Sequence, residues 1–116
     1  MDARLIPLMG SFIGARAAYT LARLEFAIHA PKGAAPPVVG RLAEPSERAL
    51  REDWPQIERE LEQAMAFARE VERSAERPRG AEEGYLRLER ALRELDQYAR
   101  AIRWVLTVTE RPGYDL

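Results

Sequence analysis

The sequence contains no cysteine and no asparagine, and it has a single histidine among its 116 residues. Without cysteine there is no disulfide framework, no thiol nucleophile and no cysteine-based metal site. A metal centre in a helix bundle needs several ligands that converge from facing helices, and His29 is the only histidine available. We therefore expect no catalytic residues, no metal site and no cofactor in this chain.

The charged residues nearly balance, so the chain as a whole has no strong attraction to nucleic acids or to acidic membranes. Lysine and arginine together number 18 against 19 acidic residues, and Lys32 is the one lysine. The net charge is −1 and the isoelectric point is about 5.9. Abundant Glu and Arg without asparagine fits a heat-adapted source, and a GC-rich genome explains the arginine content equally well.

Hydrophobic periodicity predicts an all-α protein with three helices in one domain, residues 1–116. The helices are expected at about 4–29, 46–77 and 82–110. Residues 31–45 contain four prolines and two glycines, which is typical of a connection and not of a helix. No part of the sequence has the alternating pattern of a strand.

The second and third predicted helices carry long heptad rows, separated by an Arg-Pro-Arg-Gly turn at 77–80. The rows are Ile57, Leu61, Ala64, Ala68, Val71 and Ala75 in one helix, and Tyr85, Leu88, Leu92, Leu95, Ala99, Ile102, Leu106 and Thr109 in the other. They predict a coiled-coil-like antiparallel hairpin, which forms the base of a three-helix up-down bundle. Pro55 lies near the start of the first row, so a short extra helix near 46–53 is a further expectation.

The first predicted helix is apolar on two opposite faces. One row consists of Leu5, Leu8, Phe12, Ala15, Tyr19, Ala22 and Phe26, and the other of Ile6, Ile13, Ala17, Leu21, Leu24 and Ile28. At 100° per residue their centres lie roughly 165° apart. Packing on the hairpin buries only one row, and soluble monomers rarely expose an apolar patch of several hundred Å². We expect the row that begins at Leu5 to form the oligomer interface of a homodimer, the commonest closed assembly.

The same helix is a poor candidate for a membrane span or a signal peptide. Its apolar run covers Leu5–Ala22, and Arg16 lies inside it. A central arginine opposes membrane insertion by about 2.5–3.5 kcal/mol. Pro7 and two glycines interrupt the run further. We expect a cytoplasmic protein.

A second candidate surface lies on the third predicted helix, away from its core row. Arg93, Gln97, Arg100 and Trp104 follow one another at 4-3-4 spacing. A tryptophan turned outward beside arginines is typical of a binding hot spot, but the first helix or the 31–45 connection can also cover the ring. The direction of the first helix stays open as well, because a 15-residue connection reaches about 50 Å.

These patterns predict a non-catalytic helical interaction protein that acts as an adaptor, a scaffold or a small subunit of a larger assembly. Its partner is expected to be a second copy of the chain or another protein. One alternative is a nucleic-acid-binding subunit that uses Arg93, Arg100, Arg103 and Trp104. A second alternative is a small helical enzyme that uses carboxylates and a metal, for which Glu58 and Glu62 lie one turn apart.

Overall fold

The chain folds into three long helices. The computed structural model describes residues 2–29, 35–40, 46–73 and 81–109. The helices are α1 (Leu5–His29), α2 (Glu47–Arg73) and α3 (Ala81–Thr109), and the described ranges contain no strand. The prediction of an all-α fold with three helices is confirmed, while residues 74–77 and 110, expected at helix ends, lie outside the described residues.

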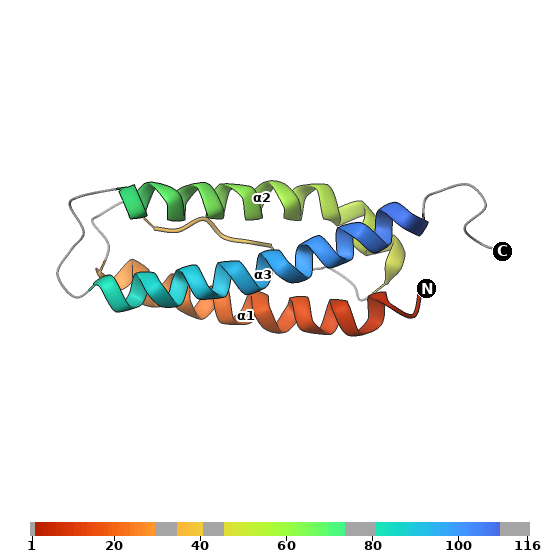
Figure 1. The fold of residues 1–116 in the computed structure, drawn as a ribbon, viewed down its shortest axis with the longest axis horizontal. Helices are drawn as coiled ribbons and strands as arrows, with labels where there is room; N and C mark the ends of the chain where they lie inside the picture. The colour runs from red at the N-terminus through yellow and green to blue at the C-terminus, as the bar shows by residue number, and fades with distance from the viewer. Residues whose placement is uncertain (1, 30–34, 41–45, 74–80, 110–116) are drawn as a thin grey trace.

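Helix α2 begins at a capping serine and continues through a proline. The Ser46 hydroxyl accepts a hydrogen bond from the backbone N–H of Ala49 (3.2 Å), which satisfies a donor that has no partner within the helix. Pro55 lies inside α2, and the first turns of the helix, drawn in yellow, stand at an angle to the remainder (Figure 1). Such a bend is the usual effect of proline in a helix. Residues 47–53 are therefore part of α2, and the expectation of a separate short helix there is wrong.

Helices α1 and α2 run in the same direction, and α3 runs against both (Figure 1). Contacts at the two ends of α1 agree with this arrangement. The guanidinium of Arg4 lies 5.2 Å from the centre of the Trp104 ring, and Glu25 pairs with Arg87 at 3.1 Å. The first two helices therefore point the same way, and the chain does not follow the predicted up-down order.

The closest helix pair is α1 with α3. Small residues from both helices lie at this contact or beside it, namely Ala15, Ala22, Gly84 and Ala91. A Cβ atom placed on Gly84 would lie 4.0 Å from the Cα of Phe26. Because little side-chain volume separates the two backbones, α1 and α3 approach each other closely, while α2 packs on α3 less closely.

The extended segment 35–40 lies between α1 and α2 (Figure 1). Three side chains on successive turns of α1 donate hydrogen bonds to its carbonyl groups. These bonds join Arg16 Nε to the Val39 carbonyl (2.9 Å), the Tyr19 hydroxyl to the Pro37 carbonyl (2.5 Å) and Arg23 Nε to the Pro36 carbonyl (2.6 Å). On the other side, the N–H of Gly40 donates to Glu60 of α2 at 3.2 Å. The segment acts as a spacer whose backbone groups are paired by the helices on either side.

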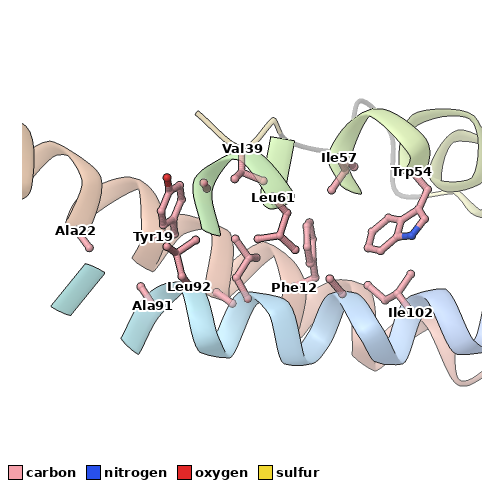
Figure 2. Close-up of a cluster of buried hydrophobic side chains, with 14 of the residues drawn as sticks. Phe12, Tyr19, Ala22, Val39, Trp54, Ile57, Leu61, Ala91, Leu92 and Ile102 are labelled. Carbon is pink, nitrogen blue, oxygen red and sulfur yellow. The ribbon is translucent and has the colours of Figure 1, made fainter. Parts of the chain in front are cut away.

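Aromatic rings fill the core between α1 and α2. Phe12 and Trp54 meet edge to face with their ring centres 5.5 Å apart, and Phe26 meets Phe67 at 6.0 Å in the same manner. Figure 2 shows Phe12, Tyr19 and Trp54 within the cluster of buried side chains. No charged side chain of the described residues is buried, and the buried rings of Tyr19 and Trp54 carry polar atoms. Long rings therefore bridge the distance that the 35–40 segment leaves between these two helices.

The heptad rows predicted for the second and third helices are confirmed as core positions. Their buried members are Ile57, Leu61, Ala64 and Ala68 in α2, and Tyr85, Leu88, Leu92, Leu95, Ala99, Ile102 and Leu106 in α3. Val71 and Thr109 are partly buried, and Ala75 lies outside the described residues. Regular helical spacing therefore identified the inner faces of both helices.

Replacing the Tyr19 hydroxyl tests the attachment of the 35–40 segment. Tyr19→Phe removes a buried donor and leaves the Pro37 carbonyl without its partner, so we expect the free energy of unfolding to fall by about 1–2 kcal/mol. Burial raises the pKa of Tyr19 to about 12. The contribution of the protonated hydroxyl is therefore complete below pH 10 and is lost as the pH rises through about 12. Urea unfolding at neutral pH and at pH 10–12 measures this loss of stability. The control variant is Tyr98→Phe, which changes the half-buried tyrosine of α3 and should not reproduce the loss.

Candidate partner-binding surfaces

The row expected at the oligomer interface lies inside the molecule. Leu5, Phe12, Ala15, Tyr19, Ala22 and Phe26 are buried, and Leu8 is partly buried. These side chains face α3, the 35–40 segment and the aromatic rings of α2. Only this row contains aromatic rings, which are long enough to reach across to α2, and that is the physical reason it turns inward. The structure therefore assigns the row to the chain's own core and not to a partner interface.

The opposite row of α1 is exposed instead. We call this surface the outer face of α1 and define it as Ile6, Gly10, Ile13, Ala17, Leu21, Leu24 and Ile28. Its five large side chains are between 48% and 77% exposed, and Gly10 and Ala17 are exposed as well. Large apolar side chains on one continuous helix face mark an interaction site more often than isolated ones do. The sequence therefore identified the two rows correctly but not which of them faces outward.

Two glycines make the first half of this surface smooth. A Cβ atom placed on Gly10 or on Gly14 would have no other atom within 4 Å. Glycine inside a helix costs about 1 kcal/mol relative to alanine, and no packing within the described chain offsets that cost. Glycine at these positions would permit a second helix to approach the α1 backbone closely.

The exposed side of α1 carries almost no charge. Between Ile6 and Leu24, every exposed residue of α1 is uncharged. The first charged residue beyond them is Glu25, which accepts a hydrogen bond from Arg87 of α3 (3.1 Å). That bond is the main reason the pKa of Arg87 lies above its ordinary value. The outer face is therefore an apolar stripe with an ion pair at one end.

Helix α1 also has the length and composition of a membrane span. An 18-residue window within Leu5–Ile28 has a mean hydropathy of 1.3, and α1 alone among the described helices reaches that range. Core helices of water-soluble proteins and signal sequences share these properties. Here a third of the apolar stretch is buried against the rest of the protein, so composition alone does not assign α1 to a membrane.

The candidate surface on α3 is exposed, a point that the sequence pattern left open. Arg93, Gln97, Arg100 and Trp104 all lie at the surface, and 58% of Trp104 is exposed. Among the described residues, the guanidinium of Arg4 lies over the indole ring, 5.2 Å from its centre. Two of the arginines are already paired, Arg93 with Glu89 at 2.6 Å and Arg100 with Asp96 at 2.9 Å. These carboxylates neutralise much of the positive charge that the sequence pattern suggested.

An open groove of about 770 Å³ separates α2 from α3. Leu61, Met65 and Ala99 contribute apolar surface to it, and the charged residues around it are Glu58, Arg59, Glu62, Arg69, Asp96, Arg100 and Arg103. Glu58 pairs with Arg103 at 3.7 Å. Within the described ranges, no three His, Asp or Glu side chains converge as they would around a metal ion. Opposite charges alternate along this groove, so its chemistry does not select a ligand of either sign.

The two tryptophans provide a direct test of these placements. Trp54 is 4% exposed and Trp104 is 58% exposed. We expect acrylamide to quench the fluorescence of the Trp54→Phe protein, which retains Trp104, several times more strongly than that of the Trp104→Phe protein. Equal quenching of the two variants would contradict the exposure of Trp104.

No known protein family matches the chain, and comparisons with curated proteins and with solved structures also found no match. The surfaces described above are therefore the starting point for a functional proposal.

Proposed function

We propose that the protein is a non-catalytic interaction protein, an adaptor or small subunit that works in the cytoplasm by binding a protein surface with the outer face of α1. The observation that supports this is the exposed apolar row from Ile6 to Ile28. Half the circumference of a helix about 10 Å in diameter, over about 33 Å of length, gives roughly 500 Å². Burying that area contributes about 12 kcal/mol, which is comparable to the 4–15 kcal/mol that association costs.

The charge distribution favours a protein partner over a membrane surface. A helix that lies in a lipid headgroup layer usually carries Lys or Arg on the polar face that borders its apolar one. The two arginines of α1, Arg16 and Arg23, bind carbonyl groups of the 35–40 segment, and the exposed charged residue of this helix is Glu25. Because no basic side chain of the described part of α1 is fully exposed beside the outer face, an apolar protein surface matches this face better than anionic lipid does.

Photo-crosslinking in cells of the source organism tests this proposal. A photoreactive amino acid replaces Leu21 at the centre of the outer face, and the control protein carries it at Ala66, an exposed residue of α2. We expect a defined protein adduct from position 21 that mass spectrometry identifies and that Ile13→Glu, on the same face, abolishes. Lipid adducts, or equal yields from the two positions, would contradict the proposal.

Exposure of Trp104 supports a second candidate function, the binding of single-stranded nucleic acid. A base can stack on the free part of the ring, and Arg93 and Arg100 lie on the same surface. The pairing of both arginines with carboxylates argues against it, because a paired arginine releases fewer counterions from the phosphate backbone.

Binding to single-stranded RNA and DNA separates this candidate from the first. If the protein uses the α3 surface in this way, it should bind single-stranded RNA or DNA at about 50 mM salt, and this binding should weaken steeply as the salt concentration increases. Trp104→Ala should then weaken binding at every salt concentration, whereas Leu86→Ala, at an exposed apolar residue of the same helix, should not. Absence of binding at low salt would eliminate the candidate.

A further inference from the structure

We infer that the partner of the outer face is a second copy of this chain, and that the two α1 helices pair antiparallel about a twofold axis at Ala17. The inference rests on the proposed function, since it names the partner of the same surface. Four features of α1 support it: the spacing of the row, the sizes of its side chains, the position of its charge and the area available.

The row is symmetric about Ala17. Ile6 and Ile28 lie 11 positions from Ala17, Gly10 and Leu24 lie seven, and Ile13 and Leu21 lie four. A twofold axis through Ala17 therefore places every member of the row opposite another member on the second copy. An isologous interface requires this self-complementarity, which a surface adapted to a different protein does not need.

The same spacing keeps two nearly straight helices in contact along their length. Ile6, Ala17 and Ile28 repeat every 11 residues, as do Gly10 with Leu21 and Ile13 with Leu24. Eleven residues in three turns is about 3.67 per turn, close to the 3.6 of a straight helix. The row therefore drifts little around the helix, and contact extends over about 33 Å.

Large and small side chains alternate between the two copies. Antiparallel pairing sets Leu24 of the second copy against Gly10, where the glycine leaves open space. It also sets Ala17 against Ala17 of the second copy, so the helices meet at their smallest residues. This close approach gives a role to Gly10 and Gly14, which have none within the described chain.

Charge distinguishes the antiparallel pair from a parallel one. Parallel pairing would bring the two Glu25 carboxylates, each beside its Arg87, to the same end of the interface. Antiparallel pairing separates the Glu25 positions by 16 residues along the helix axis, or about 24 Å. That distance exceeds the Debye length of about 8–10 Å, so repulsion between them is screened.

The area is sufficient for a dimer. Two copies of a face of roughly 500 Å² would bury about 1,000 Å² in total, where specific protein interfaces begin. A stable dimer at micromolar concentration is consistent with an interface of this size that is largely apolar.

A charge placed on the axis tests the pairing. Ala17→Glu brings two carboxylates together across the twofold axis, whereas Ala66→Glu makes the same change on α2, where Ala66 is also exposed. We expect light scattering at micromolar concentration to give twice the 13.2 kDa chain mass for the natural protein and for Ala66→Glu, and a single chain for Ala17→Glu. A single-chain mass for the natural protein, or the same mass for both variants, would overturn the inference.

Because the chain lacks cysteine, single-cysteine variants test the direction of the helices. On mild oxidation Ala17→Cys should form an intermolecular disulfide about tenfold more readily than Ala66→Cys, since pairing raises the effective thiol concentration. Ile6→Cys alone should not crosslink, because its two copies lie about 33 Å apart, but a mixture of Ile6→Cys and Ile28→Cys should. Self-crosslinking of Ile6→Cys would indicate a parallel pair and overturn the antiparallel arrangement.

The two proposals fail in different ways. A monomeric natural protein whose photoreactive residue 21 captures a different, identified protein overturns self-pairing and leaves the proposed function intact. A monomer that gives no protein adduct from residue 21 overturns both. An adduct between two copies of the chain supports both.

Discussion

The fold depends on the hydrogen bonds that attach the 35–40 segment to α1. Arg16, Tyr19 and Arg23 occupy one side of three successive turns, and each binds a carbonyl group of the segment. Because the segment occupies the space between α1 and α2, these two helices run in the same direction without close packing. Two pairs of aromatic rings, Phe12 with Trp54 and Phe26 with Phe67, bridge the distance, and this accounts for the inward turn of the aromatic row of α1. The opposite row is left at the surface as a consequence.

Much of this fold could be predicted from the sequence, because helical periodicity is a local signal. The heptad rows of α2 and α3 identified their buried faces, and Ser46 marked the start of α2. The outward face of α1 could not be predicted in the same way, since both of its rows are apolar at helical spacing. Which row faces outward depends on contacts between residues 13 to 23 positions apart in the sequence. Helical periodicity does not detect such contacts. Arg16 and Arg23, beside the aromatic row, were the one sequence signal for the inner side.

For each of the two candidate surfaces, some features could be predicted from the sequence and others could not. The exposure of Trp104 agrees with its position off the core row of α3, but its contact with Arg4 joins residues 100 positions apart and could not be foreseen. The arginines of the same surface are paired along the helix with acidic residues one turn away, and that spacing is visible in the sequence. On α1 the two glycines were visible too, yet only the structure shows that the space above them is open.

The pairing of α1 with α3 has a consequence for synthesis on the ribosome. Residues 30–80 separate the two helices in the chain, so α1 leaves the ribosome well before its closest neighbour exists. During that interval both apolar sides of α1 are without their final contacts, and nascent chains on adjacent ribosomes present identical helices to one another. Contacts between sequence-distant elements also slow folding in general. Helix α1 therefore exposes the growing chain to premature association.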